Sequence, residues 1–345
     1  MIAAGMRPRD VIVVALALTA CAFDSVGGSG GFTPNETTSG DNTGAAEATV
    51  TSTTQNGDDT LDDADTTQSP AGSEDTGGPP PAVEDIPFGE PTPIAALNNV
   101  AADDEAPTLS SDQLEIIFAS NRPGGQGGLD LYRSTRAAMG DVWSPPVPID
   151  ALNGGFDETS PELTGDGQTM LFISNRGGSY DVYLVARDLA GAWGSPEHVA
   201  GLSTSSNEYA ATPVGGTDVV LLCSDRPTGF GASDIYEGLV LRDGGFSALL
   251  PVNVSTTDDE CAMAMRGDQR ELIFTSDRAG GPGGTDLWQV SRGAVGDIFS
   301  PAALLDAINS SAIEDDPWLS PDGRTLYFAS TRAGANTDLF IARRL

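Results

Sequence analysis

The chain has 345 residues, of which 50 are acidic and 17 are basic, and its formal net charge at pH 7 is −33. Every basic residue is arginine, because the sequence contains no lysine. A polyanion such as nucleic acid would meet a repulsive surface with few compensating cations. The composition therefore predicts that the protein does not bind nucleic acid.

Residues 1–21 have the pattern of an export signal. Arg7 and Arg9 precede a short apolar run, VIVVALAL, that is too short to span a bilayer as a helix. The run ends in the tetrad Leu-Thr-Ala-Cys at Cys21, which resembles the lipobox of bacterial lipoproteins. That resemblance implies acylation of Cys21, with palmitate among the chains, and a membrane anchor. Because Ala22 and not aspartate follows, it also implies the outer membrane of the cell envelope. An ordinary secretory signal is the alternative.

Residues 22–85 contain 13 acidic residues, no basic residue and very few large apolar ones. Stretches such as GGSGGF and GGPPP cannot bury enough apolar surface to offset the entropy lost on ordering. The sequence therefore predicts a disordered acidic tether rich in glycine, serine, threonine and aspartate over 22–85, and a folded domain over 86–345.

The predicted domain consists of a unit repeated five times. An apolar strand followed by arginine recurs at spacings of 54, 50, 52 and 54 residues. An aspartate before an apolar-aromatic strand recurs with the same period, which suits four short strands and their turns. The arginines are Arg122, Arg176, Arg226, Arg278 and Arg332, and the aspartates are Asp130, Asp181, Asp234, Asp286 and Asp338.

The second strand of each unit, such as EIIFAS at 115–120 and TMLFIS at 169–174, is almost continuously apolar. A sheet with one wet face would show alternation, so these strands must be covered on both faces. Four-stranded units covered on both sides and repeated at a fixed period indicate the blades of an all-β β-propeller.

The two ends of the domain complement each other. Residues 87–98, PFGEPTPIAALN, match residues 142–153, VWSPPVPIDALN, and so form an orphan fourth strand. The last unit ends after its third strand, at Leu345. Pairing of these ends would close the ring and remove the exposed edges. We therefore predict five blades, with six as the alternative if a further unit has escaped recognition.

The pattern PWLSPDGRTLYFASTRAGANTDL at 317–339 resembles the WD-type repeat of the TolB family of periplasmic propellers, and the resemblance covers 86–345. It implies an extracytoplasmic binding or scaffolding propeller without catalysis or cofactor. The sequence departs from the family in lacking an additional N-terminal α/β domain and in having five units where the family has six. These departures put membership of the family's envelope complex in doubt.

Recurring polar residues are expected to gather on one loop face. There each arginine would lie near its aspartate and near a carboxylate before the first strand of the blade. These pairs could bind a ligand, but few ligands have fivefold symmetry, so pairing within the fold is the preferred interpretation. The additional carboxylates are Asp104, Glu158, Glu208, Glu260 and Glu314.

Residues that break the repeat are better candidates for binding. The aromatic ones could form a platform for a sugar or an anchor for a protein, and packing against their own loops is the alternative. The expected partner is an envelope protein or glycan, bound by a monomer. The candidates on the predicted loop face are Tyr180, Tyr209, Phe230, Asp316 and Trp318.

Several chemistries lack the residues they need. His198 is the single histidine, which leaves almost no material for a catalytic triad or a histidine zinc site. The acidic run Asp258-Asp259-Glu260 lacks the spacing of a calcium loop, so we expect no metal. Cys223 and Cys261 could form a disulfide in an oxidising compartment, and the sequence leaves that pairing open.

Taken together, these patterns predict a non-catalytic, lipid-anchored propeller that binds or scaffolds other envelope components. The alternative is a glycoside hydrolase or lyase that uses carboxylates lining the central channel, with Glu162, Asp315 and Asp316 as candidates. Most acids recur at equivalent positions, which favours a structural role over catalysis.

Overall fold

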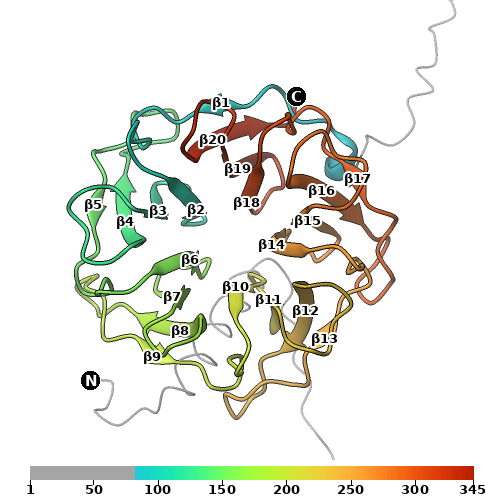
Figure 1. Cartoon of the computed structure of the whole chain (residues 1–345), viewed down its shortest axis with the longest axis horizontal. Coiled ribbons are helices and arrows are strands. Elements are labelled where there is room, and N and C mark those ends of the chain that lie inside the picture. The colour runs from blue at the N-terminus through green and yellow to red at the C-terminus, as the bar shows by residue number, and fades with distance from the viewer. Residues whose placement is uncertain (1–81) are drawn as a thin grey trace, which may run out of the picture. The chain divides into compact units, whose positions relative to one another are not determined.

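The computed structural model describes residues 82–345, which form five four-stranded antiparallel sheets around a central axis (Figure 1). The prediction of an all-β, five-bladed propeller is thereby confirmed, and the six-bladed alternative is not needed. Cys21, the predicted signal and most of the predicted tether lie outside the described residues.

In each blade the strands follow one another in sequence order from the axis outwards, except that β1, from the start of the described chain, is the outer strand of the last blade (Figure 1). The innermost strands are β2 (Asp104–Leu109), β6 (Glu158–Leu163), β10 (Glu208–Pro213), β14 (Glu260–Met265) and β18 (Glu314–Leu319). The second strands are β3 (Glu115–Ser120), β7 (Thr169–Ser174), β11 (Val219–Ser224), β15 (Glu271–Ser276) and β19 (Thr325–Ser330). The third are β4 (Asp130–Thr135), β8 (Asp181–Ala186), β12 (Asp234–Leu239), β16 (Asp286–Ser291) and β20 (Asp338–Arg343). The outer strands are β5 (Val147–Pro148), β9 (Glu197–His198), β13 (Leu250–Pro251), β17 (Ala303–Leu304) and β1 (Thr92–Pro93).

The second strands are buried at every residue, as their continuous apolar character predicts. The hydrophobic clusters lie between neighbouring blades. In one of them, Leu221 of β11 packs with Met263 of β14 and Phe274 of β15. A blade buries its two faces only against its neighbours, so closure of the ring is a condition for the core.

Closure occurs where the sequence predicts it. Strand β1 pairs antiparallel with β20, with Thr92 opposite Ile341 and Pro93 opposite Phe340. The first strand of the chain therefore completes the last blade, as Figure 1 shows at the top of the ring.

The folded part begins before the predicted boundary at residue 86. A short 3-10 helix, η1 (Val83–Asp85), lies against the propeller. Glu84 of η1 pairs with Arg266 at 2.8 Å, and the carbonyl of Val83 accepts a hydrogen bond from Arg344. These ion-pair and backbone contacts hold the end of the predicted tether although it has little apolar surface.

A disulfide joins Cys223 of β11 to Cys261 of β14, with 5.2 Å between their Cα atoms. The bridge therefore crosses from the third blade to the fourth. The sequence left this pairing open. The two cysteines are 38 residues apart, and their distance depends on how the two blades pack against each other.

Replacing both cysteines with alanine is expected to lower the free energy of unfolding by about 2–4 kcal/mol, because the cross-link limits the entropy of the unfolded chain. Urea denaturation of the variant and of the wild-type protein, each with and without reductant, measures the loss. Reductant should destabilise only the wild-type protein. Equal midpoints for the oxidised wild type and the variant would contradict this expectation.

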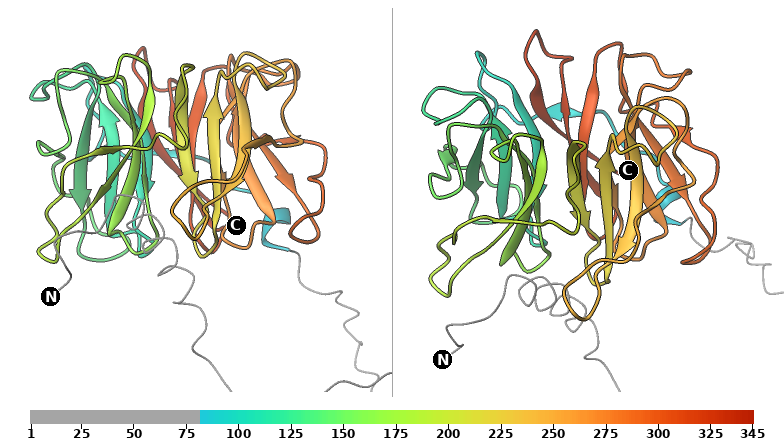
Figure 2. Two further views of the ribbon diagram at one scale, coloured as in Figure 1. Left: turned by 90° about the horizontal axis from the view of Figure 1, so that it is seen from below. Right: turned by 60° about the horizontal axis from the view of Figure 1, so that its bottom comes forward.

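The two faces of the disc carry different connections (Figure 2). The connections that follow the second strands and precede the innermost strands share one face, which we call the loop face. The hairpin turns after the innermost strands, and the connections after the third strands, lie on the opposite face. Over residues 82–345, no helix is long and apolar enough to cross a bilayer.

Candidate functional site

The five recurring arginines of the loop face are all engaged in ion pairs within their own blades. Each donates from its guanidinium to the carboxylate of the first residue of the innermost strand, to a serine at the end of the second strand, and, through Nη2, to a backbone carbonyl. The carboxylates are fully buried. The pairs are Arg122 with Asp104, Arg176 with Glu158 at 2.8 Å, Arg226 with Glu208 at 3.1 Å, Arg278 with Glu260 at 2.8 Å and Arg332 with Glu314 at 2.9 Å.

The recurring aspartates shape the glycine-rich loops. Asp130 accepts hydrogen bonds from the backbone N–H groups of Gln126 and Gly127. A Cβ at Gly125 would lie 1.9 Å from Oδ2 of Asp130, so only glycine permits this approach. Asp234 and Asp286 accept backbone N–H groups in the same way in their own loops. Asp181 instead accepts a hydrogen bond from the Ser179 hydroxyl, and Asp338 lies at the same position of the last blade.

The residues that break the repeat do not all lie on the loop face. Phe230 and Tyr209 do, with 64% and 37% of their surfaces exposed. Trp318 lies in the core, against Tyr327 at 5.8 Å between ring centroids, so the expectation that it is an exposed anchor is wrong. The reason is a register shift in β18 between Asp315 and Trp318, which places Trp318 opposite Tyr327.

Tyr180 and Tyr209 lie side by side on the loop face, with ring centroids 6.4 Å apart. The Tyr180 hydroxyl donates to Oδ2 of Asp157 at 2.7 Å, and the Tyr209 hydroxyl donates to Oδ2 of Asp225 at 3.1 Å. The bond to Asp157 raises the pKa of Tyr180 to about 12, because it stabilises the protonated phenol. These bonds fix the orientation of both rings.

The acidic residues Glu105 and Asp315 continue this surface towards the channel. Each is the second residue of its innermost strand, β2 or β18. Burial and the negative charges of Asp315, Asp103 and Asp157 raise the pKa of Glu105 to about 7. We call the set of Glu105, Asp157, Tyr180, Tyr209, Asp225 and Asp315 the acidic mouth.

Below the acidic mouth, the channel narrows to a cavity of about 20 Å³. That volume suits a single water molecule. Two carboxyl groups, those of Glu162 and Asp316, line it together with small and apolar side chains. Asp316, which has a positive φ of 51°, accepts the backbone N–H of Ala106 at 3.0 Å.

Glu162 lies between neighbouring blades. Its carboxyl oxygens accept hydrogen bonds from the hydroxyls of Thr108 in β2 at 3.4 Å and Thr212 in β10 at 3.3 Å. Burial raises the pKa of Glu162 to about 8, and burial together with the charges of Asp315 and Glu105 raises the pKa of Asp316 well above its usual range. At neutral pH Glu162 therefore holds a proton.

The structure brings together the three channel acids that the sequence singled out, Glu162, Asp315 and Asp316. Sequence reasoning did not single out Glu105, Asp157 or Asp225 as site residues. A signal for Glu105 was available, because the equivalent positions in the other blades hold Thr159, Tyr209, Cys261 and Asp315. Within residues 82–345, no three acidic, histidine or cysteine side chains converge in a way that could hold a metal ion.

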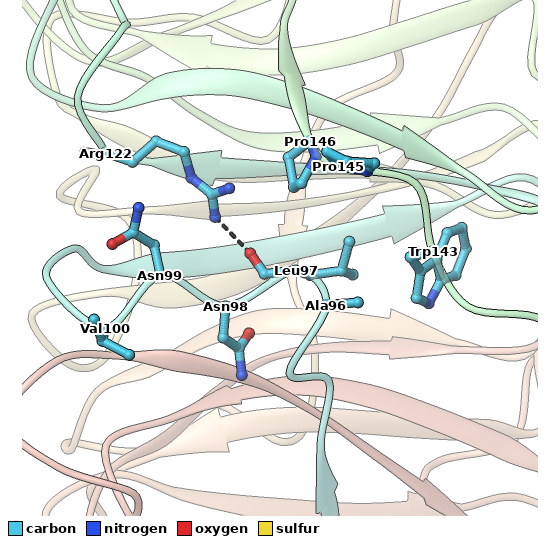
Figure 3. A pocket seen from close by; sticks show the side chains of 9 residues that line it. All are labelled: Ala96, Leu97, Asn98, Asn99, Val100, Arg122, Trp143, Pro145 and Pro146. Atoms are coloured by element: carbon cyan, nitrogen blue, oxygen red, sulfur yellow. Dashed lines mark hydrogen bonds between the residues drawn. The ribbon is translucent and has the colours of Figure 1, made fainter.

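A second depression, of about 530 Å³, lies between residues 96–100 and the first blade (Figure 3). Its polar groups are largely engaged elsewhere. Arg122 donates to the carbonyl of Leu97 at 2.6 Å, and the Asn98 side chain bonds both backbone groups of Leu339. Trp143 is buried, and the remaining lining is mainly small, apolar or proline, so the acidic mouth is the stronger candidate site.

No family model matches the chain, and no curated protein matches it. Solved structures similar to it include TolB from Acinetobacter baumannii, at 16% identity and a TM-score of 0.44, over 70% of this chain and 54% of that one. They also include Zg3597, a family 117 glycoside hydrolase produced by Zobellia galactanivorans, at 12% identity and a TM-score of 0.49, over 75% and 90% of the two chains. An endo-arabinase from Bacteroides thetaiotaomicron has 13% identity and a TM-score of 0.48, over 74% and 96%. The chain thus spans about half the length of the Acinetobacter protein.

Proposed function

We propose that the protein is a non-catalytic, TolB-like binding module of the bacterial cell envelope. A lipid at Cys21 anchors it, and the acidic tether connects this anchor to the propeller. Its ligand, an envelope protein or glycan, would bind a monomer at the loop face. The lipobox and the tether support the anchor, because a flexible segment of this length lets the propeller reach partners at a distance from the membrane.

One observation carries the proposal. The polar groups that recur in every blade are used within the fold, as the five arginine pairs illustrate. The groups that break the repeat include Glu105, Tyr209 and Asp315, each of which is the second residue of its innermost strand, at the loop-face end. A single asymmetric site on a symmetric frame is what recognition of one ligand requires.

The alternative function is that of a glycoside hydrolase or lyase, and the clustering of Glu105, Glu162, Asp315 and Asp316 in one channel favours it. Glycoside hydrolysis needs a sugar ring between two carboxyl groups, one of them ionised as nucleophile or base. A cavity of about 20 Å³ does not admit a sugar ring. Glu162 holds a proton, as the acid of a glycosidase would, but hydroxyls of two threonines from the neighbouring blades occupy both of its carboxyl oxygens. Binding is therefore the better supported function.

The test uses the full-length protein, immobilised in detergent and exposed to solubilised envelope and to purified envelope glycans. We expect a ligand that the wild-type protein retains and that the Tyr209→Ala variant loses. Leu189→Ala, which alters an exposed apolar residue on the opposite face, is the matched control and should retain the ligand.

The same incubations measure released sugars. Release of sugars that stops in Glu162→Gln would contradict the binding proposal and establish the enzyme. If Leu189→Ala loses the ligand and Tyr209→Ala retains it, the ligand binds the face opposite the loop face, and the proposed binding surface is wrong.

A further inference from the structure

We propose that the ligand of the loop face is a basic polypeptide segment, and that one of its arginine or lysine side chains enters the acidic mouth over the Tyr180–Tyr209 pair. This inference rests on the proposed function and adds the chemistry of the partner.

The distribution of charge between the two faces is the first support. On the loop face, the five arginines are neutralised by buried carboxylates. The other arginines of residues 82–345 lie in or beside the strand ends and turns of the opposite face. Carboxylates such as Asp103, Asp157, Asp225, Asp259 and Asp277 thus remain on the loop face without a salt bridge to an arginine of the described chain. Such a face attracts and orients a cationic partner.

Two buried groups beneath the loop face show the same imbalance. Asp234 and Asp286 are 1% and 2% exposed. In each, Oδ1 has no hydrogen-bond donor among the described residues, although Oδ2 accepts backbone N–H groups. Buried carboxylate oxygens usually have a donor, so these two oxygens are acceptors beneath the loop face that its own groups leave unsatisfied.

The carboxylates and aromatic rings of the acidic mouth favour the binding of a cation. Burial and then the negative charge of Asp315 raise the pKa of Glu105, so the two carboxylates repel each other, and burial raises the pKa of Asp315. A cation between them would relieve that repulsion, whereas a neutral sugar would leave it in place. The tyrosine hydroxyls are already bonded to Asp157 and Asp225, and of the two rings Tyr209 is exposed while Tyr180 is half-buried against the core. Aromatic faces flanked by carboxylates favour a guanidinium or ammonium group.

The loop face also carries exposed apolar side chains. Phe156, Phe230 and Ile313 are exposed on the loop face, at 49%, 64% and 43% of their surfaces. Side chains of arginine and lysine carry an apolar stem below the charged head, and such stems pack on exposed apolar surface. The loop face therefore matches a segment that alternates cationic and apolar residues.

The experiment measures the binding of a fluorescent peptide of arginine, glycine and leucine to the full-length protein by anisotropy, at two salt concentrations. The comparison peptide replaces each arginine with citrulline, which keeps the shape and removes the charge. We expect binding of the arginine peptide only, with affinity that falls as salt rises.

Variants locate the site. Glu105→Gln with Asp315→Asn should weaken binding at least about tenfold, and Tyr209→Leu about fivefold, while Tyr209→Phe keeps the ring and most of the affinity. Asp218→Asn is the matched control, since this exposed carboxylate lies on the opposite face, and its affinity should equal that of the wild type.

The inference would be overturned if three variants bound the arginine peptide with the same affinity. These are the Glu105→Gln/Asp315→Asn double variant, Tyr209→Leu and the control Asp218→Asn. An envelope ligand that depends on Tyr209 but is displaced by a neutral oligosaccharide and not by the arginine peptide would also overturn it; the proposed binding function would then stand with a glycan as ligand. If no envelope ligand and no peptide depends on the loop face, both the inference and the proposed function fail.

Discussion

Replacing Glu162 with glutamine is expected to flatten the decline in stability that the wild-type protein shows between about pH 4.3 and pH 8. In the folded protein, burial raises the pKa of Glu162 to about 8, whereas an unfolded glutamate titrates near 4.3. Between these values the folded state binds one proton more than the unfolded state. The free energy of unfolding therefore falls as pH rises, by up to about 1.4 kcal/mol per pH unit for this group.

The contribution of Glu162 to stability is complete below the unfolded pKa and is lost as pH rises through the folded pKa. Glutamine preserves the shape: its oxygen can accept from one of the two threonine hydroxyls, Thr108 or Thr212, and its NH2 group can donate to the other, so the variant should fold. The carboxyls of Glu105, Asp315 and Asp316 also have raised pKa values and should leave a smaller residual slope.

Urea denaturation at pH 5, 6, 7 and 8 measures this effect. Asp218→Asn, an exposed carboxylate on the opposite face, controls for the loss of one charge. The prediction is wrong if Glu162→Gln and the wild type lose stability in parallel over this range. Such a result would mean that Glu162 is already ionised in the folded protein.

Replacing Glu271 with alanine is expected to lower the free energy of unfolding by about 3–5 kcal/mol, since it leaves a buried charge without its partner. Glu271 of β15 is fully buried and accepts hydrogen bonds from both terminal nitrogens of Arg344, the residue that follows β20. It also pairs with Arg266 at 3.1 Å. The Arg344 side chain is 0% exposed, so water cannot replace Glu271.

The repeat supplies a matched control for this prediction. Glu115 holds the equivalent position in β3 and pairs with Arg187 at 2.6 Å and with Arg133. Arg133 is 43% exposed and can turn to water, so Glu115→Ala should cost less stability than Glu271→Ala. Thermal or urea denaturation compares the two variants. Equal losses of unfolding free energy would mean that the full burial of the Glu271–Arg344 ion pair adds no stability beyond that of the Glu115 pairs.

The double substitution of Glu271 and Arg344 by leucine separates the two causes of destabilisation. If most of the loss in Glu271→Ala comes from the uncompensated Arg344, removing both charges should recover part of the stability. A double variant as unstable as the single one would instead mean that the shape of the pair, and not its charge, holds the last blade.

The blades, their number and the closure of the ring could be predicted from the sequence alone. These follow from local patterns, namely the continuous apolar second strands, the period near 52 residues and the orphan strand at 87–98. The strand pattern recurs in all five units, and each unit independently indicates the same order of strands and turns. The pairing of β1 with β20 needed no further information.

The contacts between neighbouring blades could not be predicted from the sequence and are known from the three-dimensional structure. Glu105 and Asp315 lie 210 positions apart in the chain, and the closed ring brings them together at one mouth. The bulge in β18 placed Trp318 in the core, against the sequence-based expectation. The Cys223–Cys261 bridge likewise crosses between blades. The angle between blades leaves no periodic signal in the sequence, and the register shift that recurs in all five innermost strands is not marked by one residue type.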